Sequence, residues 1–387
     1  MNDKQKPSIR FKGFTEAWEQ RKAKELCSIS TGKSNTQDRI EDGKYPFYVR
    51  SPIVERSNRY LFDEEAVLTV GDGVGTGKVF HYVNGKYDLH QRVYRMFGFS
   101  EEISAKYFYY YFSNHFYDRV MAMTAKTSVD SVRYEMIADM EISLPNKQEQ
   151  ICISMLFEQL DNLITLHQRK YDKLVNVKKS MLEKMFPRDG KNVPEIRFSG
   201  FTEAWEQRKL GELGEILTGS TPSTTQTEYY SDDGIPWVTP TDINANLIYD
   251  TPKKLSEEGA EIGRVVPANT ILCTCIASIG KNALLTVKGS FNQQINSLTP
   301  SKENDAYFLL TESELWSNTM KRMAASGTMQ IVNKTEFSEL QTMVPSLPEQ
   351  QQIGEYFRNL DHLITLHQRE VEKLQNIKKS CLEKMFA

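Results

Sequence analysis

Two stretches of this 387-residue chain carry an apolar pattern with the period of an α-helix. In the first, from Leu160 to Phe186, apolar residues recur at spacings of three and four, and no Pro or Gly interrupts them. The second, from Leu360 to Phe386, is nearly identical. Lys and Arg crowd the later turns of both stretches, as suits the C-terminal end of a helix. Each stretch predicts a helix of about 40 Å, at about 1.5 Å per residue.

Elsewhere the pattern changes to short runs rich in Val, Ile and Tyr, bounded by Gly and Asp, which predict β-strands. Runs from the first part of the chain resemble runs from the second part, with apolar positions kept and the polar residues between them changed. The matched runs are "KYPFYVRSP" from Lys44 and "GIPWVTPTD" from Gly234, "AVLTVGDGVGTGKVF" from Ala66 and "TILCTCIASIGKNAL" from Thr270, "DLHQRVYRM" from Asp88 and "SFNQQINSL" from Ser290, "KYFYYYFSN" from Lys106 and "AYFLLTESE" from Ala306, and "AKTSVDSVR" from Ala125 and "ASGTMQIVN" from Ala325. The aromatic pair of runs predicts helices. Each middle region is therefore predicted to be an α+β domain.

The nonamer "FTEAWEQRK" occurs twice, over Phe14–Lys22 and Phe201–Lys209. With the repeated helices, it indicates a tandem pair of structural units in which the ends are kept and the middles are rewritten. Such a plan is typical of a fixed scaffold that presents two different binding surfaces. We predict a first domain over residues 1–148, a helix over 149–187, a second domain over 188–347 and a second helix over 348–387.

Connectivity predicts how the helices pair. Each helix has one apolar stripe and extends beyond its own domain, so the stripe needs a partner. The short loop "PRDGKNVPE" starts the second domain where the first helix ends. We therefore expect an antiparallel pair with one domain at each end and a pseudo-two-fold axis, a dumbbell. The alternative is that each helix folds onto its own domain.

Composition fits a soluble globular protein, with 26% charged and 39% hydrophobic residues. No signal peptide and no apolar run of about 20 residues is visible, and the five cysteines have no paired spacing, so we expect a cytoplasmic protein. Cys273 and Cys275 would share one face of a strand, where packing is favoured over a metal or a disulfide. The net charge of −3 means that any nucleic-acid binding must depend on local basic surface.

Motifs for catalysis are missing. The stretch "GDGVGTGK" from Gly71 has Asp72 where a phosphate-binding loop needs Gly, and Val79 where it needs Ser or Thr. We interpret it as a loop between strands. The six histidines form no metal-binding pair at helical spacing with a carboxylate. We expect no catalytic site and no metal site in this chain.

Binding features are stronger, because amide and basic residues occupy matched predicted loops in both middles. Asn and Gln can pair with adenine and Arg or Lys with guanine, while Thr, Ser and Lys hold phosphates. In the first middle the candidates are Arg50, Lys78, His90, Gln91, Arg92, Lys126, Thr127, Ser128 and Arg133. In the second they are Thr239, Ser278, Lys281, Asn292, Gln293, Gln294, Ser326, Thr328, Gln330 and Lys334. The aromatic cluster "YFYYYF" is interpreted as core and not as a base-stacking surface.

The double plan, together with "FTEAWEQRKLGEL", "FNQQINSL" and "VPSLPEQQQIGEYFRNLDHLITLHQRE", closely resembles the specificity subunits of type I restriction–modification systems. The resemblance covers essentially the whole chain. It implies two target-recognition domains that each read one half of a bipartite double-stranded DNA target, held apart by the helices. The first middle departs from the second, with "DLHQRV" in place of "FNQQIN", so its base-reading residues are less well defined by the resemblance.

The resemblance also implies partners: two methyltransferase subunits and the restriction or translocase subunits. S-adenosylmethionine, ATP and Mg are then expected on those partners, with no cofactor in this chain. Two other interpretations stay open on the residues alone. One is a non-catalytic two-domain adaptor that binds protein or glycan, and the other is a nucleotide-dependent enzyme that uses the Gly71 loop.

Overall fold

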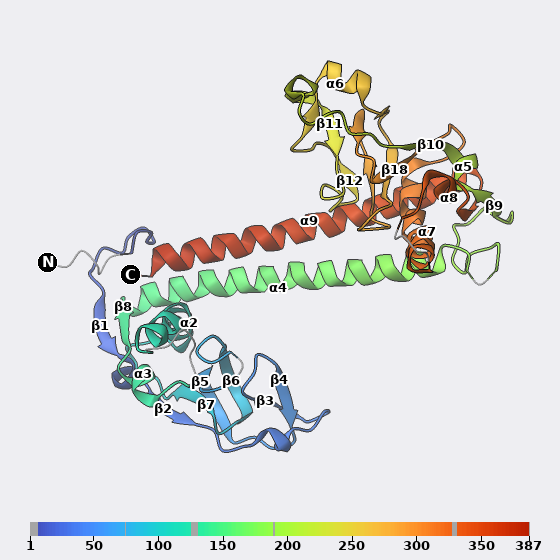
Figure 1. The fold of residues 1–387 in the computed structure, drawn as a ribbon. Helices are drawn as coiled ribbons and strands as arrows, with labels where there is room; N and C mark the ends of the chain where they lie inside the picture. Colours follow the sequence, from blue (N-terminus) through green and yellow to red (C-terminus); the bar gives the residue numbers. More distant parts are fainter. Residues whose placement is uncertain (1–6, 74, 125–130, 189, 327–330, 387) are drawn as a thin grey trace. The chain divides into compact units, whose positions relative to one another are not determined.

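The computed structural model describes residues 7–73, 75–124, 131–188, 190–326 and 331–386 (Figure 1). The chain divides into two compact units. Unit 1 comprises Met1–Gln168 and Arg369–Ala387, and unit 2 comprises Arg169–Gln368. Both units include part of helix α4 (Lys147–Lys184) and part of helix α9 (Leu347–Met385). Each helix is longer than the repeated stretch predicted from the sequence. Helix α4 begins at Lys147, soon after Pro145, and α9 begins at Leu347, soon after Pro345.

Unit 1 is an α+β domain. Its other elements are β1 (Glu19–Lys22), α1 (Ala23–Leu26), β2 (Ser28–Thr31), the 3₁₀ turn η2 (Thr36–Asp38), β3 (Tyr45–Tyr48), β4 (Val54–Ser57), β5 (Phe62–Val70), β6 (Phe80–Leu89), β7 (Val93–Phe97), α2 (Ala105–Ala122), α3 (Tyr134–Ala138) and β8 (Glu141–Leu144). Six strands form one sheet in the order β2-β7-β5-β6-β3-β4. All neighbours are antiparallel except β3 and β6, which are parallel.

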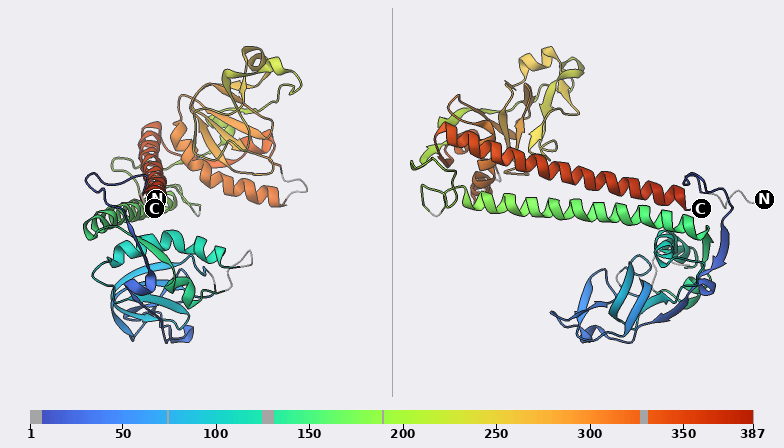
Figure 2. Two further views of the ribbon diagram at one scale, coloured as in Figure 1. Left: turned by 90° about the vertical axis from the view of Figure 1, so that its left-hand side faces the viewer. Right: turned by 180° about the vertical axis from the view of Figure 1, so that it is seen from behind.

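Helix α2 lies between this sheet and α4, as two views agree (Figures 1 and 2). Successive residues of a strand point to opposite faces, and β5 uses both. Val67 packs into the core that includes α2, whereas Ala66 and Leu68 pack into a second core on the other face. The "YFYYYF" stretch lies in α2, and Tyr107, Phe108 and most of its neighbours are buried. The prediction that this stretch is core is therefore confirmed.

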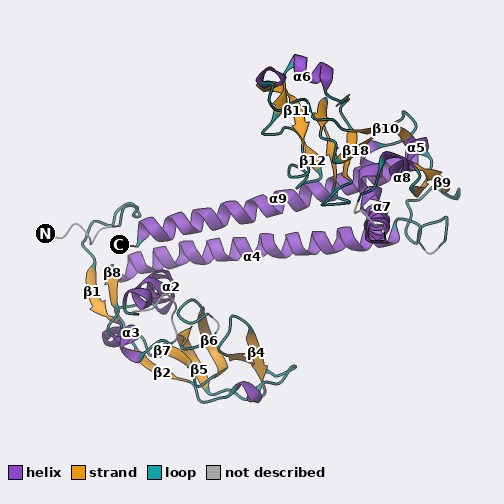
Figure 3. Cartoon of the chain, in the orientation of Figure 1, coloured by secondary structure: helices purple, strands orange, loops and turns teal. Residues whose placement is uncertain are grey.

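Unit 2 is a second α+β domain (Figure 3). Its elements are β9 (Glu206–Lys209), α5 (Leu210–Leu213), β10 (Gly214–Thr218), the 3₁₀ turn η3 (Thr227–Tyr229), β11 (Tyr230–Val238), β12 (Leu247–Ile248), β13 (Lys254–Leu255), α6 (Glu257–Ile262), β14 (Val265–Val266), β15 (Thr270–Thr274), β16 (Asn282–Leu285), β17 (Gly289–Phe291), β18 (Ile295–Pro300), α7 (Ala306–Ser326), α8 (Lys334–Ser338) and β19 (Gln341–Val344). The main sheet has the order β10-β18-β15-β16-β12, and a second has the order β13-β11-β17-β14. Cys273 and Cys275 are buried and free in β15 and directly after it, so they pack as predicted.

The repeated nonamer forms the same structure in both units. Its last four residues are β1 in unit 1 and β9 in unit 2, and each pairs antiparallel with the strand that leads into a long helix, β8 or β19. Its tryptophan, Trp18 or Trp205, is buried against an aromatic residue of α2 or α7. The nonamer is thus a structural joint between each domain and its helix.

A buried ion pair secures each joint. Arg10 contacts Glu149 through two N–H···O contacts of 2.6 and 2.7 Å, and Arg197 contacts Glu349 through two contacts of 2.7 Å. Both glutamates are almost fully buried in the first turn of their helix. Two-point geometry fixes orientation as well as distance, so the pair defines how the helix leaves the domain.

The two helices run antiparallel within each unit. In unit 1 the end of α9 meets the start of α4, with Phe386 stacked on Phe157 and Lys378 paired with Asp161. In unit 2 the end of α4 packs against α9 through Phe186 and Phe357. Because each domain core includes the end of the helix from the other repeat, the alternative in which each helix folds only onto its own domain is wrong.

The alignment of the middles is confirmed where β5 is matched with β15, but it is wrong by two residues where β6 is matched with β16 and by one residue for the helices. Trp18 contacts Tyr107, and its counterpart Trp205 contacts Phe308. Tyr107 therefore corresponds to Phe308, whereas the sequence match places it opposite Tyr307. A run of aromatic residues offers several plausible registers, and the tryptophan contact selects one of them.

Candidate nucleic-acid interface

Two three-residue loops occupy equivalent places in the units. Residues 90–92 join β6 to β7 in unit 1, and residues 292–294 join β17 to β18 in unit 2; we call each one a triplet. The chain enters each triplet with an N–H that donates to the strand end at Tyr48 or Val238. It leaves with a carbonyl that accepts from Gly71 or Cys275. Matched bonds at both ends give the two triplets the same backbone and different side chains.

The first residue of each triplet holds the third in place. His90 is buried, and its Nδ1 accepts the backbone N–H of Arg92 at 3.0 Å. In unit 2, Asn292 is also buried, and its Oδ1 accepts the N–H of Gln294 at 3.0 Å. Burial and the nearby Arg50 guanidinium lower the pKa of His90, which favours the neutral ring that can accept this bond. The His90 imidazole and the Asn292 amide therefore have the same structural role, which is to accept the backbone N–H of the third residue.

The second residue is Gln in both triplets, and its side chain is bonded to the loop that follows β2 in unit 1 or β10 in unit 2. Gln91 donates through Nε2 to Asn35 Oδ1 at 2.7 Å. Gln293 instead accepts a hydrogen bond from the Thr221 hydroxyl. Both glutamines are exposed. Each therefore keeps one amide group directed to its loop and presents the other outward.

The third residue differs most. Arg92 is exposed, and its Nε lies 3.7 Å from Asp72, a half-buried carboxylate that Arg50 also approaches at 3.5 Å. Two guanidinium groups around one carboxylate leave this cluster with a net positive charge. In unit 2 the equivalent Gln294 is neutral, and its Oε1 accepts a bond of 3.2 Å from Asn292 Nδ2. The two units thus present a cationic and a neutral surface at the same position.

Loops after two further strands of each unit lie beside the triplet. In unit 1 they carry Arg50, after β3, and Asp72, after β5, and an isolated bridge joins Asp72 to Ser131. In unit 2 the corresponding bridge joins Ile276 to Ile331. The structure therefore brings together Arg50, His90, Gln91 and Arg92 from the predicted set, as it does Asn292, Gln293 and Gln294.

Other predicted residues lie nearby or apart. Thr239 forms a turn in which its hydroxyl donates to Asp242 at 2.6 Å, and Lys78 lies 4.4 Å from the Tyr117 ring centroid. The predicted set also includes four exposed residues outside the triplets, Ser278, Lys281, Arg133 and Lys334. Lys126, Thr127, Ser128, Thr328 and Gln330 lie outside the described residues, as does the side chain of Ser326.

Sequence reasoning missed the supporting residues Asp72, Asn35 and Thr221. An acidic residue is not expected in a DNA-binding surface, and in the sequence Asp72 is notable only as a departure from the phosphate-loop motif. Its nearness to Arg92 depends on how the sheet brings two strand ends together, which no local pattern reports. Asn35 and Thr221 occur in Ser/Thr/Asn-rich stretches, "GKSNTQ" and "GSTPST", whose polar composition was the available signal.

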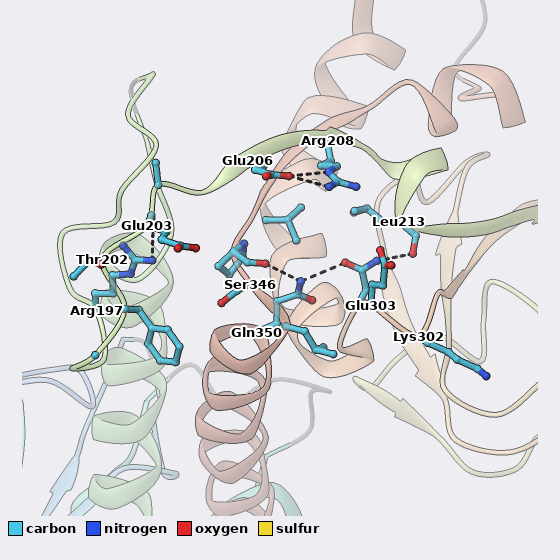
Figure 4. Close-up of a pocket in the computed structure, with 17 residues that line it drawn as sticks. Arg197, Thr202, Glu203, Glu206, Arg208, Leu213, Lys302, Glu303, Ser346 and Gln350 are labelled. Carbon is cyan, nitrogen blue, oxygen red and sulfur yellow. Dashed lines mark hydrogen bonds and ion pairs between the residues drawn. The ribbon is translucent and has the colours of Figure 1, made fainter.

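A separate pocket lies at the joint of unit 2 (Figure 4). It has a volume of about 470 Å³, and six residues of the nonamer line it. In Figure 4, Arg197 donates to the backbone of Glu203, Arg208 pairs with Glu206 at 2.8 Å, and Gln350 bonds to Asn304. Charged side chains of both signs line the pocket. Because these residues belong to the repeated frame, this surface is independent of the triplets.

The long helices expose apolar residues at equivalent positions. Leu163 and Leu166 of α4 are 43% and 46% exposed, and Leu363 and Leu366 of α9 are 40% and 44% exposed. Two adjacent exposed leucines on each helix form an unpartnered apolar patch in each unit. Their repetition indicates that both patches serve the same purpose.

Within the described residues no cluster of His, Cys, Asp or Glu has the geometry to hold a metal ion. Nor is any helix there sufficiently long and apolar for a membrane crossing.

Comparisons with known proteins agree with the repeated plan. A sequence profile described as the type I restriction modification DNA specificity domain matches the chain twice, over residues 15–176 and 202–376. The HindI specificity subunit of Haemophilus influenzae is 34% identical over 148 residues, which cover 37% of this chain and 32% of that protein. The MjaVIII specificity subunit of Methanocaldococcus jannaschii is 20% identical over 372 residues, covering 88% and 85% of the two chains.

Lengths differ among these relatives. The matches to HindI and to the MjaIX specificity subunit of M. jannaschii span 32% and 41% of those proteins. A solved structure, that of the type I restriction–modification S subunit from M. genitalium, covers 99% of both chains with a TM-score of 0.74 at 16% identity. That likeness is one of fold, and it extends over both repeated α+β domains and both helices, as the sequence predicts.

Proposed function

Because the chain belongs to the family of type I restriction–modification DNA specificity subunits, we propose that it reads a bipartite DNA target for such a complex. Unit 1 reads one half of the target and unit 2 reads the other, each through its triplet and the strand-end loops beside it. The helices set the distance between the halves. The chain supplies recognition, and its partners supply the chemistry.

The observation that carries this proposal is the pair of triplets. One backbone conformation, held by matched hydrogen bonds, presents His-Gln-Arg in unit 1 and Asn-Gln-Gln in unit 2. Arg, Asn and Gln are the side chains that read base edges in the major groove. Two domains that recognise different DNA sequences need a common backbone with different polar side chains on it, as in the two triplets.

The frame is proposed as the docking surface for two methyltransferase subunits, one at each unit. The exposed leucine patches support this, since they repeat with the frame and not with the triplets, and the pocket of unit 2 is lined by residues of the same frame. Partner subunits would also add phosphate contacts. That contribution is needed because a net charge of −3 gives this chain little attraction of its own for DNA.

S-adenosylmethionine, ATP and Mg are proposed to bind to the methyltransferase and restriction subunits. The residues described here offer no metal-binding cluster, and the Gly71 loop does not match a phosphate-binding motif. We also propose that the protein is cytoplasmic, because the DNA that it would bind is located there.

Methylome sequencing of a host with and without the gene tests the proposal. We expect one bipartite methylated motif to disappear with the gene. Gln91→Ala should alter one half of that motif, and Gln294→Ala should alter the other. Two alanine variants that each degraded both halves equally would contradict independent reading. Purified chain with S-adenosylmethionine should not methylate DNA until the methyltransferase is added.

A further inference from the structure

We propose that the third residue of each triplet reads a base and that the units differ in the base they accept: Arg92 selects guanine, and Gln294 selects adenine. This inference rests on the proposed function, because it assigns the substrate of the same two surfaces. It makes Arg92 and Gln294 specificity-determining residues, and His90, Asn292 and Asp72 positioning residues.

The geometry of each triplet singles out its third residue. The first residue is buried and spends its side-chain acceptor on the backbone N–H two residues later. The second residue commits one end of its amide to a neighbouring loop. The third residue is supported by the first through its own backbone N–H, and its side chain is not bonded to the loop that holds the second residue. Preorganisation of this kind reduces the loss of side-chain freedom on binding.

Arg92 is anchored in a way that suits guanine. Its Nε faces Asp72 at 3.7 Å, which leaves the two terminal amino groups as a fork. Guanine presents O6 and N7 as adjacent acceptors in the major groove, and a guanidinium fork donates to both. Arg50 approaches the other oxygen of Asp72 at 3.5 Å and offsets its charge. The carboxylate can therefore orient Arg92 without making the surface negative.

Gln294 is oriented by a different bond. Asn292 Nδ2 donates to its Oε1 at 3.2 Å, which sets which way the amide points and leaves its Nε2 as a free donor end. Adenine offers an N7 acceptor beside an N6 donor, and a glutamine amide pairs with both. The remaining lone pair of Oε1 is available for N6. The same backbone thus carries a reader for each of the two purines.

A phosphate contact is the competing role for Arg92. Phosphate contacts position a protein and carry no sequence information. Replacement of Arg by a neutral Gln at the equivalent place would then remove a positioning contact from unit 2. A base reader explains the exchange directly, because changing the side chain changes the base. The experiment below separates the two roles.

The test uses the assembled methyltransferase complex with Arg92→Gln, its reciprocal Gln294→Arg, and Arg92→Lys. Binding is measured by competition with duplexes in which each base pair of the native target is replaced in turn. Arg92→Gln should lower affinity for the native target roughly ten- to a hundredfold and shift one guanine of the first half to adenine. Gln294→Arg should shift one adenine of the second half to guanine. The untouched half is the internal control in each case.

Arg92→Lys keeps the charge and loses the fork. If Arg92 reads guanine, this variant should lose most of its discrimination at that base. The inference is overturned if Arg92→Lys behaves as wild type, while Arg92→Gln weakens binding to all sequences equally and reduces the salt dependence by about one phosphate contact. His90→Asn should retain the guanine preference and His90→Ala should relax it. If the wild-type complex preferred no defined sequence, the proposed function itself would fail instead.

Discussion

Within unit 2, the ammonium group of Lys178 on α4 lies 2.9 Å from a carboxylate oxygen of Asp361 on α9. Unit 1 repeats the contact with the helices exchanged, since Lys378 of α9 lies 2.5 Å from Asp161 of α4. In both units the aspartate also accepts a tyrosine hydroxyl at 2.9 Å, from Tyr307 or Tyr110. The carboxylate therefore joins three elements: the two long helices and α2 in unit 1 or α7 in unit 2.

We predict that Lys178→Met lowers the free energy of unfolding of unit 2 by about 1.5–3 kcal/mol, the range for a hydrogen bond to a charged group. Burial lowers the pKa of Lys178, but Asp361 and Glu314 raise it more, so the lysine stays charged and the loss should not depend on pH near neutrality. Hydrogen exchange resolved to peptides should locate the effect in unit 2. Lys378→Met should act in unit 1, and exposed Lys179→Met is the control for both. An equal loss from Lys179→Met would contradict the prediction.

A buried carboxyl predicts a pH dependence of unit 2. Glu312 in α7 is 2% exposed, and burial raises its pKa from 4.5 to about 8, while the neighbouring Thr342 and Met343 lower it by a smaller amount. A raised folded-state pKa stabilises the fold below pH 4.5, and this contribution is lost as the pH rises through about 8. Glu312→Gln keeps the shape without the charge. We expect the variant to be more stable than wild type at pH 9, with a flatter pH profile.

Tryptophan fluorescence during urea unfolding measures this effect, because three of the four tryptophans, Trp205, Trp237 and Trp316, belong to unit 2. Urea midpoints would be compared between pH 5.5 and 9. Parallel profiles for wild type and Glu312→Gln would show that the carboxyl does not titrate in the folded state. The counterpart of Glu312 in unit 1 is Tyr111, so no matching pH dependence is expected there.

The leucine patches predict the number of partners. Leu163→Glu with Leu166→Glu should remove one methyltransferase subunit from the complex, and Leu363→Glu with Leu366→Glu should remove the other. The leucines are exposed, so a charge there costs little stability but is costly once a partner covers it. Native mass spectrometry would report one partner copy in place of two. If either double variant still bound two methyltransferase subunits, the proposal that its leucine patch is a docking surface would be wrong.

The spacer function predicts a change in target length. Four residues inserted after Leu166 add about 6 Å and close to one turn, so the apolar stripe of α4 stays nearly in phase. The methylated motif should keep both halves and gain about two base pairs between them, at about 3.4 Å per base pair. A two-residue insertion turns the stripe by about 200° and should impair folding. If the four-residue variant were fully active on a target with an unchanged number of base pairs between its halves, the helices would not set this distance.

Apolar spacing was sufficient to predict much of this fold. The match of "DLHQRVYRM" with "SFNQQINSL" is confirmed by equivalent backbone bonds at His90 and Asn292. The match of β5 with β15 succeeds because buried positions alternate along a strand and tolerate no slip of one residue. The match of β6 with β16 fails by two residues, because the loop before β16 is shorter. The helix match failed by one residue, because consecutive aromatic residues satisfy more than one register. The contact of Trp18 with Tyr107 fixes the register of the helices, and this contact joins segments that are distant in the sequence.

The sequence draws attention to the residues of a triplet but does not distinguish their structural settings. His90, Gln91 and Arg92 were all expected to contact DNA. The structure divides them into a buried support, a tethered amide and an exposed guanidinium. These different settings depend on the group that each side chain contacts in the folded protein. Asp72 lies near Arg92 only because the sheet brings the ends of two strands together.

The nonamer joint, with its buried Arg–Glu pair, borders each middle region with the same residues in both repeats. At the level of the gene, such repeats are places where homologous recombination can exchange the segment between them. A transplanted middle would meet the same tryptophan, the same nonamer strand and the same ion pair, so the joint offers either middle the same frame. Recognition of half a target could then be inherited as a cassette. A single crossover would give a lineage a new specificity while the other half of its target, and its fit to the same partners, stayed unchanged.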